Sequence, residues 1–513
     1  MNTKNVWKWG FALLFALVLA SCSFVPDNTG KADTIPEMND QRDFLAALKA
    51  MGNYKIDEAE LEKQILQLIN PETVGRSITP NEKTVITGSR KLPISEQRIA
   101  NRSFYARSVA GEQEPVDIYE FTTENPNSGK PGYVLASNDM RIGNILAVID
   151  GGTLEDEEEW FSDIIFSGIA NHIDYTLDLY DSISDEEVRD VLETFVPLPV
   201  AGRALAVSAS GSDSYTASGK GLIHYWYPDA PLVQSVWYSW TGGYEPRVPV
   251  AWNQWYPYNY VVRRSFNSTA WNDYVTGCGP TALSQLMAYH GRPAKCTWNE
   301  TVPNLNVNYN NRIYNWADMR LVSGSYADPY TSAEWDIAVL MYEIGMRSTP
   351  RANYKKRTTD KDGNVTGPST GTPPSAMITA LKQMGYNNTT PSAFSPYNLN
   401  VVRDSLALDL PVIMYGFSDA SSGHSWIVDG IRKMTYAEYL TKTYTRVSDG
   451  VTSRSWVWTD RDFVHCNAGW QSKRENAWYL SSIFYMRDDY ISHARNNKPY
   501  YYQYNLQILP YIY

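Results

Sequence analysis

The sequence predicts an α+β fold in two parts, a smaller N-terminal region and a larger C-terminal region. Helices flank a short group of strands in the first part, and helices precede strands in the second. The chain has 513 residues, which exceeds the length of one ordinary core and predicts more than one domain. A polar stretch at 206–220, rich in serine and glycine, predicts the linker between the two parts.

The first residues predict an export signal that is not part of the fold. Lys4 and Lys8 precede an apolar run over 11–20 that is too short for a membrane span. The run closes with Leu19-Ala20-Ser21-Cys22, which resembles a bacterial lipobox with Cys22 as the lipidated residue. We therefore expect a lipoprotein signal peptide over 1–22 and an exported protein anchored to a membrane, in the periplasm or at the cell surface. The alternative is an ordinary signal peptide with a chance cysteine.

The N-terminal region is predicted to be a polar tether over 23–42 followed by a compact domain over 43–205. Helical periodicity and acidic first turns predict four helices, at Asp43–Met51, Asp57–Ile69, Leu154–Tyr180 and Ser184–Phe195. Apolar runs between turn residues predict three strands, at Ile118–Phe121, Tyr133–Ala136 and Ile145–Ile149.

The C-terminal region, over 221–513, predicts a second α+β domain. Three helices are predicted, one starting at Cys278 and two at Ser332–Ile344 and Pro374–Met384. Four strands follow in the prediction, at Val412–Phe417, Trp426–Ile431, Phe463–Cys466 and Ala477–Leu480. The polar stretch at 355–371 predicts a surface loop.

Charge and cysteine content exclude some classes of protein and leave one question open. The net charge of -11 argues against a nucleic-acid partner, because no basic stripe is present to neutralise phosphates. Apart from Cys22 the chain has three cysteines, Cys278, Cys296 and Cys466, so at least one thiol is free. Cys296 and Cys466 could form a disulfide, or both could be buried free cysteines.

Cys278 is the candidate nucleophile, because glycines bracket it just ahead of a helical pattern. Gly277 precedes it, Pro280 suits a first helical turn, and apolar residues then recur at helical spacing. The N–H groups and positive dipole of a helix start stabilise a thiolate and lower its pKa. The alternative is a small buried thiol that packs a helix start.

Three further residues could complete a catalytic site around Cys278. His424 lies at the start of an apolar strand and is the candidate general base. Asn467, at a strand end, could orient the imidazole, and Gln254 could donate its amide to an oxyanion. His465 stays a competing base, because it shares a strand face with Asn467.

These residues stand in four motifs that resemble a known family. The motifs are Trp-Asn-Gln-Trp-Tyr-Pro-Tyr-Asn over 252–259, Gly-Cys-Gly-Pro-Thr-Ala-Leu-Ser-Gln over 277–285, Gly-His-Ser-Trp-Ile-Val-Asp-Gly over 423–430 and His-Cys-Asn-Ala-Gly-Trp over 465–470. Their order and spacing are similar to those of papain-like cysteine peptidases, and the local motifs look like the streptopain family. Residues 132–139 and 145–152 are similar to the inhibitory propeptide of that family. The chain departs from the family pattern at Ala468 and at 471–472.

The resemblance implies a papain-like cysteine peptidase domain preceded by a smaller α+β prodomain that inhibits it. Cys278, His424, Asn467 and Gln254 would be catalytic, and Trp470 and Gly277 would contact the substrate. The expected partners are protein or peptide substrates, the chain's own prodomain and a membrane through the lipid, with no metal or cofactor. The expected function is a lipid-anchored cysteine endopeptidase zymogen. The alternatives are a related amidase or acyltransferase, and a peptide- or glycan-binding surface lipoprotein with a degenerate site.

Overall fold

The structure, a computed structural model, describes residues 41–52, 54–70, 83–92, 116–125, 129–154, 159–194, 214–216, 223–226, 233–322, 331–359, 361, 365–386, 390–417, 423–446, 452–469, 477–484 and 504–513. In the N-terminal region it forms two helices, four strands and two more helices. They are α2 (Gln41–Met51), α3 (Glu58–Ile69), β1 (Val85–Leu92), β2 (Ile118–Asn125), β3 (Lys130–Ser137), β4 (Ile145–Ile149), α6 (Glu159–Asp181) and α7 (Asp185–Thr194).

The four predicted helices and three predicted strands of this region are confirmed, with changes at their ends. α6 begins at Glu159, five residues after the predicted start, and β1 was not predicted. β1 was missed because its residues are mostly exposed and do not alternate between apolar and polar, so its sequence gives no strand signal. Asp57 caps α3 by accepting the backbone N–H of Glu60 at 2.8 Å.

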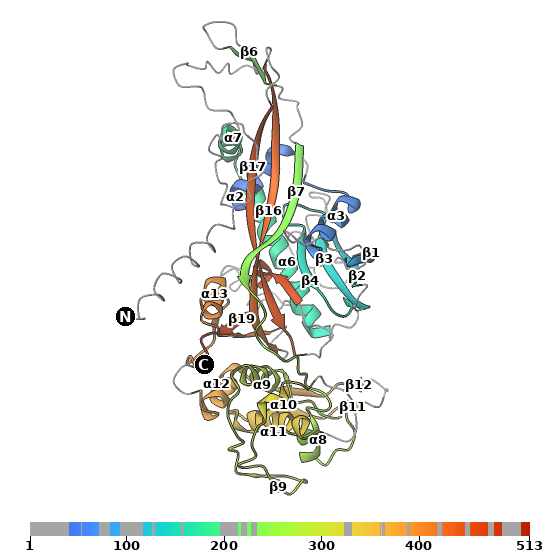
Figure 1. Cartoon of the computed structure of the whole chain (residues 1–513), viewed down its shortest axis with the longest axis vertical. Helices are drawn as coiled ribbons and strands as arrows, with labels where there is room; N and C mark the ends of the chain where they lie inside the picture. The colour runs from blue at the N-terminus through green and yellow to red at the C-terminus, as the bar shows by residue number, and fades with distance from the viewer. Residues whose placement is uncertain are drawn as a thin grey trace, which may run out of the picture. The chain divides into compact units, whose positions relative to one another are not determined.

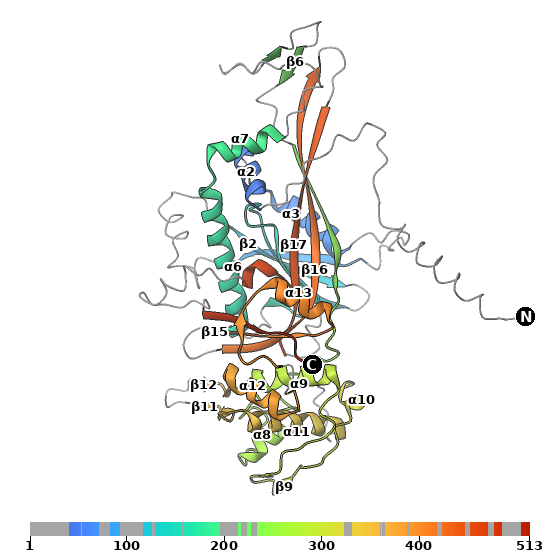
Figure 2. The same cartoon turned by 90° about the vertical axis from the view of Figure 1, so that its left-hand side faces the viewer.

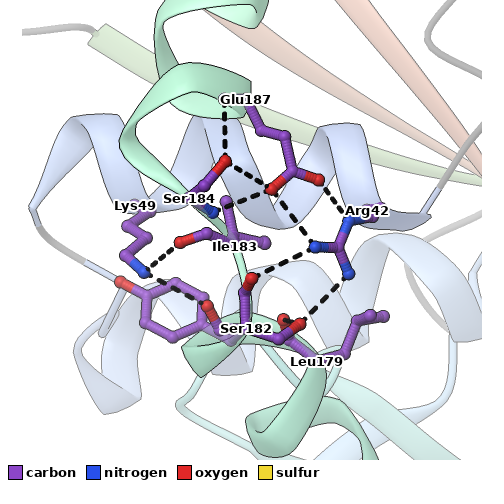
Figure 3. Close-up of polar contacts among 8 residues, drawn as sticks. Arg42, Lys49, Leu179, Ser182, Ile183, Ser184 and Glu187 are labelled. Carbon is purple, nitrogen blue, oxygen red and sulfur yellow. Dashed lines mark hydrogen bonds and ion pairs between the residues drawn. The ribbon is translucent and has the colours of Figure 1, made fainter.

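Helix α2 is tied to the turn between α6 and α7 by its two basic residues (Figure 3). Arg42 forms an ion pair with Glu187, and Lys49 Nζ donates to the carbonyl of Ile183 at 2.7 Å. Ser184 and Glu187 form reciprocal bonds at the start of α7, where Glu187 Oε2 accepts the Ser184 N–H at 2.8 Å. The first described helix is therefore fixed to the last helices of its region.

The C-terminal region begins with strands, continues with helices and ends with the main part of a sheet. Its first strands are β6 (Ile223–Trp226) and β7 (Val233–Tyr244), and β5 (Ser214–Thr216) precedes them. The helices are α8 (Tyr260–Ser265), α9 (Cys278–His290), α10 (Trp316–Met319), α11 (Ser332–Arg347), α12 (Pro374–Gln383) and α13 (Leu399–Ala407). Short strands between them are β8 (Thr301–Val302), β9 (Val307–Asn308), β10 (Asn353–Lys355), β11 (Thr358–Thr359), β12 (Val365–Thr366), β13 (Ser369–Gly371) and β14 (Ser395–Pro396). The last elements are β15 (Val412–Phe417), β16 (Gly423–Arg446), β17 (Thr452–Asn467), β18 (Ala477–Leu480), the 3-10 helix η4 (Ser481–Phe484) and β19 (Tyr504–Leu509).

Two predictions for this region need correction. The stretch at 355–371, predicted as a plain loop, carries all of β11, β12 and β13. β11 pairs with β12, and β13 pairs with β10, in two small two-stranded sheets. The predicted linker at 206–220 contains β5, which pairs with β6, and the rest of that linker lies outside the described residues. The other domain boundaries stay predictions, and the chain from Met38 to Tyr513 forms one compact unit.

One antiparallel sheet connects the N-terminal and C-terminal regions. Its strand order is β1-β2-β3-β4-β18-β17-β16-β15-β19-β14, and the two regions meet where β4 pairs with β18. β16 and β17 form a long hairpin with β7 alongside (Figure 1), so the predicted strands at 426–431 and 463–466 are its inner parts. The hairpin arms beyond 435 contain many threonine, tyrosine and charged residues, and their apolar residues are too few and too scattered to predict long strands.

Two hydrophobic cores lie on opposite faces of this sheet. Met414, Trp426 and Val428 belong to the first core, which also contains apolar residues of α2, α3, α6 and β2 to β4. Ile413 and Ile427 belong to the second core, which α8, α9, α11 and α12 fill (Figure 2). Because side chains alternate along a strand, neighbouring residues of β15 and β16 enter different cores.

Candidate active site

Cys278 is the first residue of α9, as predicted. Gly277 is the N-cap with φ of 93°, a backbone conformation that side chains other than glycine rarely adopt. A Cβ atom at Gly277 would lie 2.8 Å from the Thr370 side chain of β13, so only glycine fits. Residues 279–288 of α9 are all buried, which makes this helix the centre of the second core. The predicted nucleophile is therefore placed on a rigid element.

The surroundings of Cys278 shift the pKa of its thiol in opposite directions. Burial raises the pKa of the Cys278 thiol above its ordinary value, although the N–H and hydroxyl of Ser425 and the N–H of Gly279 act to lower it. Its Sγ atom lies 4.0 Å from the carbonyl oxygen of Gly423. Gly423 and Ser425 flank His424 in β16, so the predicted nucleophile meets the strand at the backbone of the predicted base.

The His424 ring lies on the other face of that strand. Its side chain is buried and stacks on Trp426, with ring centroids 5.9 Å apart and an interplanar angle of 11°. Ser425, which contacts Cys278, points to the second core and bonds Met377 of α12. Burial lowers the pKa of His424 well below its ordinary value, so the imidazole is neutral at pH 7.

The backbone after Asn467 orients the His424 ring. His424 Nε2 lies 3.2 Å from the carbonyl oxygen of Ala468, which assigns the proton to Nε2 and the basic lone pair to Nδ1. The Asn467 side chain is used elsewhere, since its Nδ2 donates to Val250 O at 2.7 Å and its Oδ1 accepts the Gly469 N–H at 3.3 Å. The direct imidazole contact expected of Asn467 stays a prediction, and sequence reasoning missed the carbonyl of Ala468, which no side-chain pattern reveals.

Gln254 lies beside the approach to Cys278. Its backbone carbonyl accepts the N–H of Thr276 at 3.0 Å, two residues before the thiol, and its side chain is buried. Gln285 of α9 accepts the N–H of Trp252 at 3.1 Å. The segment that carries Gln254 is thus bound to the turn before Cys278 and to the middle of the helix that Cys278 begins. The structure brings Gln254, Cys278, and the backbones of His424 and Asn467 into one neighbourhood.

The remaining predicted residues have varied outcomes. Cys22 and Trp470 lie outside the described residues. His465, the competing base, lies with Nδ1 2.5 Å from Oδ1 of Asp429 and is buried. Cys296 and Cys466 are both buried free thiols, so the disulfide between them is wrong and the alternative is confirmed.

No group of three or more histidine, cysteine, aspartate or glutamate side chains that could hold a metal ion occurs among the described residues. Within the same parts of the chain, no helix has the length and apolar character needed to cross a bilayer.

A cysteine at the start of a buried helix, beside a histidine at the start of a sheet strand, defines the class of papain-like cysteine hydrolases. Residues 252–479 match the family model of the Peptidase C10 family. This match lies in the C-terminal region, which is similar to the streptopain family, and the protein is a cysteine peptidase.

The chain is similar to a mutant fragment of prointerpain A from Prevotella intermedia, with 16% identity and a TM-score of 0.40, over 77% of this chain and 95% of that chain. No curated protein matches the chain.

Proposed function

We propose that this cysteine peptidase is an endopeptidase with Cys278 as nucleophile, His424 as general base and acid, Asn467 as orienting group and Gln254 in the oxyanion hole. The observation that carries the proposal is the meeting of Cys278 Sγ with the backbone on both sides of His424. In the full chain the His424 ring faces away from Cys278, so the proposed proton transfer requires a change of the β16 backbone that brings the ring to the Cys278 side of the strand.

The proposed chemistry follows from these groups. His424 takes the thiol proton on Nδ1, and the thiolate attacks the peptide carbonyl carbon. Gln254 and the backbone N–H of Cys278 stabilise the negative oxygen of the tetrahedral intermediate. The imidazolium then gives its proton to the leaving amine, which leaves an acyl group on Cys278. Water, deprotonated by His424, hydrolyses this thioester and restores the thiol.

The direct test is labelling with a peptide that carries a thiol-directed electrophile. We expect one covalent adduct per chain, located by mass spectrometry at Cys278 and absent from Cys278→Ala. Labelling at Cys296 or Cys466 instead would exclude Cys278 as the nucleophile.

We also propose that the full chain is a latent zymogen, inhibited by the N-terminal region. Support comes from the shared sheet and from the shared first core, in which apolar residues of the N-terminal region pack together with Trp426 and Val428 of the strand that carries His424. The raised pKa of Cys278 and the lowered pKa of His424 favour the neutral thiol and imidazole over the reactive ion pair. The full chain should react slowly with iodoacetamide at pH 7 and faster above pH 9, whereas the processed enzyme should react quickly at pH 7.

The last part of the proposal concerns location. The Leu19-Ala20-Ser21-Cys22 sequence supports export and a lipid anchor on Cys22. Cys22→Ser should move the protein from the detergent phase to the aqueous phase and leave its peptidase activity unchanged. Unchanged partitioning into detergent would mean that Cys22 carries no anchor.

A further inference from the structure

The segment that leads to Gln254 has no strand partner and is held by buried side chains. Residues 245–253 follow β7 without forming a further strand. Asp429 accepts the N–H groups of Arg247 and Val248, and Asn467 donates to the carbonyl of Val250. Because the N–H and carbonyl groups of this segment have no sheet partner, these bonds to the buried side chains of Asp429 and Asn467 fix its path.

Asp429 is the central anchor of this segment. Its carboxylate is fully buried, and Oδ2 accepts the N–H of Arg247 at 3.1 Å and that of Val248 at 2.8 Å. Its other oxygen, Oδ1, lies 2.5 Å from His465 Nδ1. A buried carboxylate is stable only with several such donors, and three donors from two elements meet this one.

A β-bulge places Asp429 in this position. Val428 pairs with Cys466 and Gly430 pairs with His465, so Asp429 is the extra residue in β16. Bulges redirect side chains and are common beside active sites. Gly430 allows the close approach of β17, since a Cβ atom there would lie 3.0 Å from the Cβ of His465.

His465 and Asn467 act on the same segment from one face of β17. They are two residues apart in the strand, so both side chains point the same way. His465 supports Asp429, which holds Arg247 and Val248, while Asn467 holds Val250. The segment then reaches Gln254, whose carbonyl is bound to Thr276 next to the catalytic turn.

We propose that Asp429, supported by His465, is a positioning residue of the oxyanion hole that acts through Gln254. This inference rests on the proposed function, in which Gln254 stabilises the tetrahedral oxyanion. It also gives His465 a structural partner in place of a role as the base. Loss of the Asp429 anchor shifts the segment and weakens the oxyanion contact, but it leaves the thiol and its base in place.

The first experiment compares two reactions of Cys278 in Asp429→Asn, in whichever form of the chain is active for the wild type. Hydrolysis of a peptide amide needs the oxyanion hole, whereas alkylation by iodoacetamide does not. We expect kcat to fall roughly 10- to 100-fold, less than the full loss of an oxyanion donor. KM and the alkylation rate should stay within about twofold of wild type, because substrate binding and the reactivity of the thiol are unchanged. Asp462→Asn, an aspartate of β17 paired with Arg403, is the matched control and should leave both reactions unchanged.

The second experiment is a double-mutant cycle with Gln254→Ala. If Asp429 acts through Gln254, adding Asp429→Asn to Gln254→Ala should cost little further kcat. Additive losses, or an equal fall in alkylation and hydrolysis, would overturn the inference. Activity in Cys278→Ala would instead overturn the proposed function, so the two failures are distinguishable.

A third experiment uses two variants of His465 and tests the inference even if Asp429→Asn does not fold. His465→Asn places an amide N–H near the former Nδ1 and should retain most of the activity, because Asp429 keeps its donor. His465→Phe removes the donor and should lose kcat as Asp429→Asn does, again with unchanged alkylation. An inactive His465→Asn that still alkylates normally would make His465 a catalytic group and refute its positioning role.

Discussion

The two faces of the central sheet differ in which parts of the chain complete them. The second core, with α9 and Cys278, is built from residues of the C-terminal region alone. The first core, which shares its face with His424 and Trp426, takes many of its apolar residues from the N-terminal region. The nucleophile and the predicted base of one site therefore depend on different parts of the chain.

This difference indicates how one chain can fold with its peptidase inactive. The N-terminal region can stabilise the His424 side of the sheet without contacting the helix that carries Cys278. Removal of that region alters the first core and leaves the second core intact. The predictions that follow separate the two faces, from the largest effect to the smallest.

Cys278→Ala tests the face that the C-terminal region completes. Peptide hydrolysis should fall by several orders of magnitude, because the attacking atom is gone. Thermal unfolding should stay within about 1 °C of wild type, since a half-buried thiol at a helix start contributes little packing energy. Activity is measured on a peptide substrate and unfolding by calorimetry. Retained turnover would refute the assigned nucleophile.

His424→Ala tests the shared face and should affect both activity and stability. Loss of the general base should lower kcat roughly 100- to 10,000-fold. The same change empties a buried position against Trp426, so the full chain should also lose about 1–3 kcal/mol of unfolding free energy. The measurements are kcat and urea denaturation of the full chain. A stability loss in Cys278→Ala but not in His424→Ala would contradict the comparison.

Much of this arrangement could be predicted from the sequence, for physical reasons. Strands β15 and β18 were predicted with their observed bounds, because apolar runs between turn residues define buried strands. The Cys278 helix was predicted from its glycine bracket and its periodicity. The strand face of His424 could not be predicted, because alternation relates residues within a strand and does not say which core each face meets. The roles of Ser425, Asp429 and Ala468 depend on register and on a bulge, which only the folded chain reveals.

Acid should act on the shared core through His172 of α6. Burial lowers the pKa of His172 to about 4, and Arg461 of β17 adds to this effect. A neutral His172 therefore stabilises the fold fully above about pH 6.5, and this contribution is lost as the pH falls towards 4. The loss of unfolding free energy should be at most about 3 kcal/mol, because the pKa falls from 6.5 to about 4 and each pKa unit corresponds to about 1.4 kcal/mol.

A matched histidine at the C-terminal end of α9 separates this effect from general acid sensitivity. Burial also lowers the pKa of His290, in α9, to about 4. After cleavage between the regions, His172→Gln should reduce the release of the N-terminal region at pH 5, whereas His290→Gln should not. Size-exclusion chromatography at pH 5 and pH 7.5 measures this release. Equal release from wild type and His172→Gln would show that His172 does not hold the regions together.

The smallest effects come from one helix cap in each region. Thr331 caps α11 in a capping box, where Oγ1 accepts the Glu334 N–H at 3.2 Å and Glu334 Oε2 accepts the Thr331 N–H at 2.8 Å. Asp57 caps α3 with one bond. Each change to alanine should cost about 1 kcal/mol, or roughly 2–4 °C in Tm.

Thr331→Ala should lower the Tm of both the full chain and the processed peptidase, because α11 packs in the second core. Asp57→Ala should lower only that of the full chain, and an equal shift in the processed peptidase would mean that the first region remains part of its fold.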